Sequence, residues 1–233
     1  MRIAEMNWMQ AERRLAEDDR CVLPIGSVEH HAFLSLATDV ILAERVSLEA
    51  AEPLGVPVFP PLAYGFTPSF AAYPGTVSLK LDTLLAVMRD LLESLHAQGW
   101  GRIVIVNGHG GNSAVASLAA ELMAQHPRLQ LKLHNWWNAP RTWAAVRELE
   151  PHSAHASWME NLPWTRIADV QSPTGVKPPV DLNRYRLLAP RQARELAGDG
   201  NFGGSYMRPD ADVLRMWDAA VQETRELIEG PWR

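Results

Sequence analysis

Residues 26–39, which read GSVEHHAFLSLATD, concentrate side chains that are able to bind a metal ion directly after the apolar run VLPI. In an extended segment, Glu29 and His31 point to the same side of the chain, so a carboxylate and an imidazole can reach one centre. This is the ligand set expected for zinc, manganese or iron at a hydrolytic site. Each residue also has an ordinary alternative, since Glu29 and His31 suit a solvated loop and Asp39 suits a helix cap.

The segment NGHGGN, residues 107–112, is the second candidate site because it follows the apolar run RIVIV. A Gly-rich turn between a strand and a helix can bind phosphate through its backbone amides, so a nucleotide site is one interpretation. However, the turn is neither GxGxxG nor a P-loop, and no lysine follows it. We therefore favour His109 as a metal ligand, with glycines that permit a tight bend and with Asn107 and Asn112 holding the loop by hydrogen bonds.

These two segments need a scaffold, and the alternation of strand-length apolar runs with helix-like stretches predicts one. The pattern is typical of an α/β fold with three layers, α/β/α, around a mostly parallel central sheet. Ligands of such sheets bind beyond the carboxyl ends of the strands, which brings Glu29, His31 and His109 to one edge. The predicted strands are 21–27, 56–65 at the sheet edge, one from Arg102, and 129–137; the predicted helices start at Thr38, span 81–99, end before Pro127, and span 210–230.

Composition limits the class of protein. The 233 residues suit a single domain, 1–233, and the net charge of −5 with mixed signs excludes a nucleic-acid footprint and a basic membrane patch. The single cysteine, Cys21, excludes an internal disulfide, and no run approaches the roughly 20 apolar residues of a membrane span. We expect a soluble cytoplasmic protein with a small-molecule or peptide partner. Pro- and Gly-rich stretches after residue 138 predict surface loops and no second core.

Several motifs, in order along the chain, resemble those of the creatininase family of metal-dependent amidohydrolases. They are LPIGSVEHH followed by TD, then YPGTVSL at 73–79, VNGHGGN, and HASWMEN at 155–161, and the GDGNFGG segment resembles the family's C-terminal ending. The resemblance implies a creatininase-like fold, a homo-oligomer such as a hexamer, and hydrolysis of a C–N amide-type bond in a cyclic amide, a formamide or a short peptide.

The resemblance also implies specific roles for individual residues. Two divalent ions, zinc, manganese or iron, would activate one water, with Asp39 as the shared ligand. Gly111 stands where some members carry a ligand glutamate, so Glu160 is the expected remaining ligand. Residues five apart on a continuous helix differ by roughly 140° in direction, so His155 and Glu160 reach one centre only if the turn between them is irregular. The implied ligands are Glu29, His31, Asp39, His109 and Glu160, and the implied catalytic residues are His155, as a proton shuttle, and Glu160.

Three departures from the family pattern concern the substrate. The segment AFLSLATD is one residue shorter than the family's and lacks its second histidine, Phe70 stands where a histidine is common, and Trp158 replaces an acidic residue. Either the substrate contacts differ, or the chain is a catalytically silent binding or assembly subunit. Six of the nine tryptophans lie between residues 136 and 217 and suit a pocket wall or a subunit interface equally. The candidate substrate contacts are Ser78, Gly110, Gly111, Trp136, Trp137 and Trp158.

Overall fold

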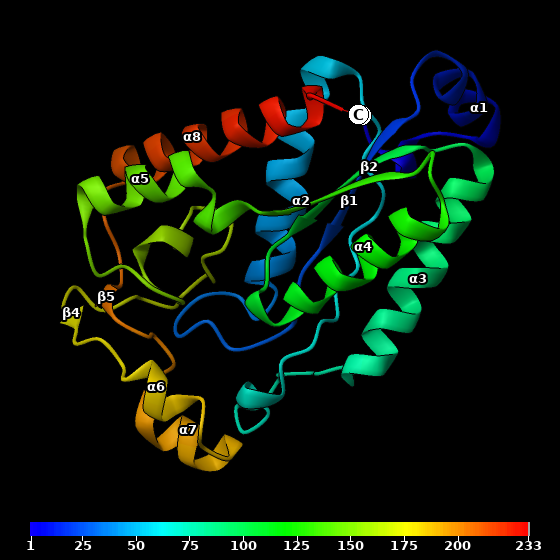
Figure 1. Ribbon diagram of the computed structural model, residues 1–233. Helices are drawn as coiled ribbons and strands as arrows, with labels where there is room; N and C mark the ends of the chain where they lie inside the picture. Colours follow the sequence, from blue (N-terminus) through cyan, green and yellow to red (C-terminus); the bar gives the residue numbers. More distant parts are fainter. Residues whose placement is uncertain (233) are drawn as a thin grey trace.

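The computed structural model describes residues 1–232 and has a parallel three-stranded sheet at its centre (Figure 1). Its strands are β1 (Arg20–Ile25), β2 (Arg102–Asn107) and β3 (Gln130–Asn135), in the spatial order β1-β2-β3. Ile25 pairs with Asn107, and Asn107 pairs with Asn135. The carboxyl ends of the three strands are therefore level, and the loops that follow them emerge at one edge.

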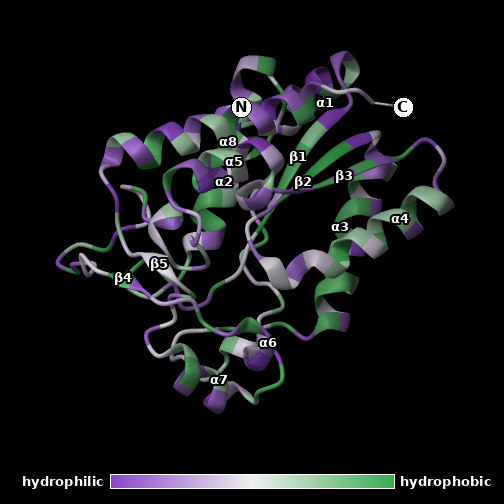
Figure 2. Cartoon of the chain, turned by 60° about the vertical axis from the view of Figure 1, so that its left-hand side comes forward, coloured by the Kyte–Doolittle hydropathy of each residue, from purple (hydrophilic) through white to green (hydrophobic). Residues whose placement is uncertain are grey.

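Helices cover both faces of this sheet, which confirms the predicted three-layer α/β/α class. Alternate strand residues divide the core in two because successive side chains of a strand point to opposite faces. Val22 and Val104 pack toward one helical layer, whereas Leu23 and Ile105 pack toward the other. Figure 2 shows the strands largely in the hydrophobic colour between helices of mixed colour. The first layer holds α2 (Thr38–Ala51), α5 (Pro140–Leu149) and α8 (Asp210–Glu229), and the second holds α3 (Leu81–Gln98) and α4 (Val115–Gln125).

The predicted edge strand 56–65 lies beside β1 but forms no continuous ladder. Val58 bridges Val22 and Leu62 bridges Ile25, both in the parallel sense, as isolated pairs. Pro57 and Pro60 lack the N–H groups that a ladder requires, so the pairing is interrupted. The edge position is confirmed, whereas the regular strand is not.

The C-terminal half contains more structure than the predicted surface loops. Phe70, Tyr73 and Tyr185 form a small apolar cluster with two alanines of α7, so the expectation of no second core was wrong. The residues of this cluster come from two distant parts of the sequence, 70–73 and 185–197, so no local periodic pattern predicts it. The cluster includes residues of α6 (Leu182–Tyr185) and α7 (Pro190–Ala197), which Figure 1 places at the opposite end of the molecule from α1 (Trp8–Glu17). A small antiparallel sheet of β4 (Val176–Lys177) and β5 (Gly204–Ser205) lies before and after these helices in the sequence.

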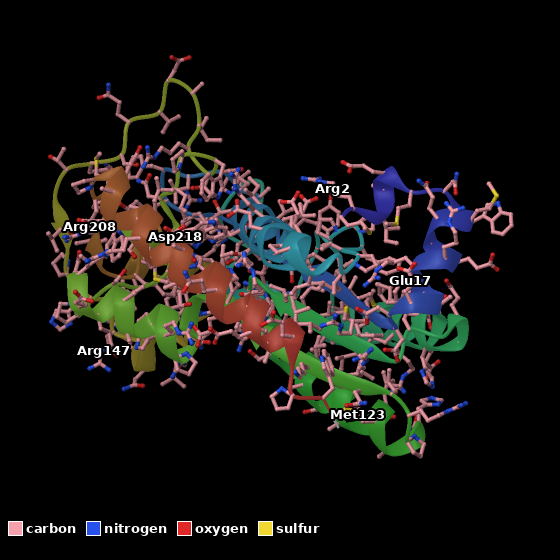
Figure 3. The ribbon with its side chains drawn as sticks, turned by 90° about the horizontal axis from the view of Figure 1, so that it is seen from above. Arg2, Glu17, Met123, Arg147, Arg208 and Asp218 are labelled. Carbon is pink, nitrogen blue, oxygen red and sulfur yellow. The ribbon has the colours of Figure 1, made fainter. Side chains whose placement is uncertain are left out.

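The outer helical faces are polar. Seen from above, α5 and α8 lie side by side, and the labelled residues Arg147 and Asp218 are exposed on them (Figure 3). Among residues 1–232, every helix is too short or too polar to cross a lipid bilayer. Single 3-10 turns at Ile3–Glu5, Glu52–Leu54, Pro68–Phe70 and Trp136–Asn138 complete the connections between elements.

Candidate metal centre

Asp39 lies at the centre of a group of buried acidic and imidazole side chains. Its Oδ1 is 3.0 Å from Nε2 of His31, and its Oδ2 is 3.2 Å from Nδ1 of His109. Oε1 of Glu29 is also 3.2 Å from Nδ1 of His109, and Oε2 of Glu160 is 4.0 Å from Nε2 of His31. Ligand atoms of Glu29, Asp39 and His109 lie within 4.8 Å of one another, as do those of His31, Asp39 and Glu160. The structure thus brings together all five predicted ligands in two groups that share Asp39.

The helix-cap interpretation of Asp39 does not describe its contacts. Asp39 lies in the first turn of α2, but the N-cap is Ala37 and no side-chain cap bond is formed. Instead, Oδ2 of Asp39 accepts a hydrogen bond of 2.9 Å from the hydroxyl of Ser27. Ala32, with a φ of 50°, bends the loop between His31 and α2. The shortened AFLSLATD segment therefore still delivers its aspartate to the centre.

The loop after β2 holds His109 by the predicted asparagine contacts. Asn107 donates to the carbonyl of His109 at 2.7 Å and accepts from its N–H at 3.0 Å. Asn112 donates to the carbonyl of Gly26 at 3.0 Å, which ties this loop to the one after β1. The carboxylates beside the His109 ring would repel a phosphate, so the geometry favours a cation over the nucleotide interpretation.

Gly111 tests this loop geometry because a methyl group there would overlap both the Phe66 carbonyl oxygen and the His109 ring. We expect Gly111→Ala to lower the free energy of unfolding by about 1–3 kcal/mol, the usual cost of overpacking. Gly110→Ala is the matched control, since a methyl group there meets nothing within 4 Å. Urea unfolding of the metal-free variants measures the difference, and equal stabilities would contradict the placement of the loop.

The turn between His155 and Glu160 is irregular, as their joint approach to the centre requires. Ala156 has a φ of 57°, and Trp158–Glu160 forms one 3-10 turn. The N–H of Ala156 donates to Oε2 of Glu160 at 2.6 Å, which folds the segment back on itself. The ring of His155 consequently lies 4.5 Å from that of His31, centroid to centroid.

Burial and mutual charge set the protonation of this centre in the metal-free protein. Burial opposes charge on His31, but the carboxylates of Asp39, Glu160 and Glu29 outweigh it and raise its pKa to about 10. Burial raises the pKa of Glu160 to about 7, although His31 opposes the shift. Burial, together with the charge of His31, holds the pKa of His155 well below its ordinary value. His155 is therefore neutral at physiological pH.

The donor set fits divalent metal ions. Oε1 of Glu29 and Nε2 of His31 are buried and have no hydrogen bond of acceptable geometry among the described residues, despite their charged neighbours. Buried polar atoms are normally satisfied, so these two point to a missing partner. Carboxylate and imidazole ligands together suit zinc, manganese or iron.

Thr67 supports Glu29 from behind, because its hydroxyl donates to Oε2 of that carboxylate. Residues that orient a ligand in this way typically change metal affinity by about 10- to 100-fold when they are replaced. We expect Thr67→Val to weaken metal affinity by about this factor, measured by competition with a chelator. Thr224→Val, at a buried threonine that bonds His134 instead, should leave the affinity unchanged. Equal affinities in the two variants would contradict the role of Thr67.

A cavity of about 1060 Å³ opens onto the centre. Of the predicted substrate contacts, Gly110, Gly111 and Trp137 line it. Trp136 and Trp158 are instead buried in the core cluster that includes residues of α8, and neither lines the cavity. Ser78 accepts a hydrogen bond of 2.9 Å from the N–H of Thr67 and lies behind the wall. The cavity is also lined by residues absent from the predicted contacts, including Phe70, Trp143, Tyr185, Arg186 and Phe202.

Comparison with known proteins places this chain in a family. The creatininase family model, described as creatinine amidohydrolase, matches residues 4–228. Creatinine amidohydrolase of Pseudomonas putida is 29% identical over 163 residues, which cover 64% of this chain and 62% of that protein. Mycofactocin precursor peptide peptidase of Mycolicibacterium smegmatis is 36% identical over 115 residues, covering 46% of each. The chain thus spans between about half and three fifths of the length of these relatives.

The fold likeness extends further than the sequence matches. A solved structure named Creatininase Mn superposes with a TM-score of 0.75 at 23% identity, covering 98% of this chain and 97% of that one. At this identity the likeness concerns the fold. Because the family model spans nearly all of the sequence, this protein belongs to the creatininase family.

Proposed function

We propose that this chain is a metal-dependent hydrolase of a C–N amide-type bond in a cyclic amide, a formamide or a short peptide. The observation that carries the proposal is the position of Asp39, whose two oxygens face two different histidines. A carboxylate shared in this way is typical of sites where a pair of ions acts on one water. The names of two relatives, an amidohydrolase and a peptide peptidase, support the same bond class.

The five ligand residues divide into two proposed ion sites. Glu29, Asp39 and His109 would hold one ion, and His31, Asp39 and Glu160 the other. When bound, divalent ions polarise a carbonyl and lower the pKa of water. Zinc, manganese and iron are all compatible with these ligands, and creatininase structures named Creatininase Mn and Zn-Zn type support the first two.

His155 is the proposed proton carrier. Its ring stacks on Phe70, with centroids 5.1 Å apart, and its Nε2 is buried with no hydrogen-bond partner among residues 1–232. Because burial keeps this imidazole neutral, Nε2 is free to accept a proton from the attacking water. Returning that proton to the departing nitrogen completes cleavage of the C–N bond.

A screen of metal-loaded protein tests the proposal. We expect hydrolysis of at least one member of a panel of lactams, formamides, creatinine-like rings and short peptides, with two equivalents of metal per chain. His109→Ala should abolish it. The alternative, a catalytically silent binding or assembly subunit, rests on the histidine missing from the AFLSLATD segment and on Phe70 replacing a histidine. Undiminished activity in His109→Ala would refute the mechanism, and bound metal without activity on any substrate would favour the silent subunit.

We also propose that the enzyme acts as a homo-oligomer. Trp8 on α1 is 71% exposed and Leu187 after α6 is 86% exposed, the two highest values for large apolar side chains among the described residues. Burial of such side chains between subunits is the simplest way to cover them. Light scattering of the full chain tests this, and a monomer at micromolar concentration would contradict it.

A further inference from the structure

We propose that Arg186 forms an anion subsite at the cavity mouth, and that the enzyme selects amides whose amine portion carries a carboxylate. Such substrates are N-acyl amino acids and short peptides cleaved before their C-terminal residue. The inference rests on the proposed amide hydrolysis and adds the substrate class.

The charged side chains that line the cavity differ in sign and in burial. Glu29, Asp39 and Glu160 are buried at the metal centre, whereas Arg186, the residue directly after α6, is exposed and lines the same cavity. Among the described lining residues, Arg186 is the single lysine or arginine. A substrate carboxylate near this guanidinium would be attracted to it, which favours one orientation of the substrate.

The Arg186 side chain has no structural ion pair to account for it. Residues 182–194 contain Arg184, Arg186, Arg191 and Arg194 and no acidic residue, although the whole chain carries a net charge of −5. None of these four arginines forms a salt bridge with the described carboxylates, in contrast to Arg208, which contacts Asp212 at 3.1 Å. Arginine binds carboxylates in a bidentate geometry, so an unpaired guanidinium at a cavity mouth suits a carboxylate ligand.

A series of rings connects the proposed proton carrier to this arginine. The ring of His155 lies 5.0 Å from that of Phe202, and Phe202 lies 4.8 Å from Tyr185, the neighbour of Arg186 in the chain. His155 is proposed to serve the departing nitrogen, so the amine portion of the substrate lies on this side. An amino acid placed there would rest its side chain on the rings and direct its carboxylate toward Arg186.

The cavity size agrees with a substrate of this kind. At about 1060 Å³ it is slightly larger than ordinary ligand pockets, which range over roughly 300–1,000 Å³. A single small ring would leave most of this space filled with water. Figures 1 and 2 both show α6 and α7 on the side where the strands end, so these helices lie at the edge of the sheet that carries the metal centre and not at the far end.

The test compares N-acetyl-L-phenylalanine with N-acetylphenethylamine, which has the same scissile amide and aromatic ring but no carboxylate. For metal-loaded wild type we expect kcat/KM to favour the carboxylate compound by about tenfold, the usual gain from a charged hydrogen-bonded pair. Arg186→Gln should remove this preference, mainly through KM, and leave the uncharged compound unaffected. Arg186→Lys should restore part of it. Arg191→Gln, on the same segment but outside the cavity wall, should behave as wild type.

Two outcomes would overturn the inference without touching the proposed function. One is equal hydrolysis of the two compounds by wild type, and the other is an unchanged preference in Arg186→Gln. If neither compound is hydrolysed, the inference is tested by measuring the binding of each compound. Trp137 and Trp143 line the cavity, so a change in their fluorescence reports its occupancy. If the carboxylate compound binds more tightly than the uncharged one, and Arg186→Gln removes this difference, the result supports the anion subsite but not the hydrolysis. Equal binding, or none, refutes the subsite.

Discussion

Asp39→Asn is expected to remove both metal ions and to lower kcat/KM by more than about 100-fold. Replacement of a residue that merely supports a ligand costs about 10- to 100-fold, so loss of the ligand that serves both ion sites should exceed this range. The reason is geometric, since Oδ1 of Asp39 faces His31 and Oδ2 faces His109. Elemental analysis of protein purified without chelator, together with steady-state kinetics, measures both effects.

Two single-site variants sharpen this prediction. Glu29→Gln removes a ligand from one group, and Glu160→Gln removes a ligand from the other, so each should retain about one equivalent of metal. Asp82→Asn is the matched control, because Asp82 also lies in the first turn of a helix but is exposed. Two retained equivalents in Asp39→Asn would show that the aspartate does not bridge, whatever the activity.

The sheet and the convergence of the candidate ligands were predictable because both follow from strong local signals. The runs at β1 and β2 are continuous and apolar, as buried parallel strands require, and α3 ends at Gly99, which adopts the left-handed conformation of a C-cap. Once the strands are parallel and level, the residues after them must meet at one edge. Glu29 and His109 therefore approach each other although 80 positions of sequence separate them.

The cavity wall was less predictable because its residues depend on tertiary placement. Trp136 and Trp158 lie in the short turns Trp136–Asn138 and Trp158–Glu160. In such irregular segments the direction of a side chain does not follow a fixed period along the sequence. Both rings enter the core. The sequence did not single out Arg186, because exposed arginines are common. Its place in the cavity wall follows only from the packing of α6 beside the site. The GDGNFGG segment did resemble a family motif, and Phe202 within it lines the cavity.

His155→Gln is expected to lower kcat by about 10²- to 10⁴-fold, the usual contribution of a positioned general acid or base. Metal content should stay at the wild-type level, because all five proposed ligands remain. The glutamine keeps most of the volume against Phe70 and Phe202 but cannot carry a proton between water and the leaving nitrogen. His152→Gln, at an exposed histidine three positions earlier, is the control and should behave as wild type.

The dependence on the leaving group separates a proton carrier from a residue that only fills space or binds metal. Amides with an activated amine, such as nitroanilides, need little protonation of the departing nitrogen, so His155→Gln should slow them much less than it slows alkyl amides. If the role of His155 were purely structural, His155→Gln would slow the hydrolysis of nitroanilides and of alkyl amides equally. One ring nitrogen of His155 also lies within 4.8 Å of ligand atoms of Glu29 and His31. His155 is therefore also placed to bind a metal ion together with these two residues. In that case metal content would fall with activity, and the assignment of His155 as proton carrier would be wrong.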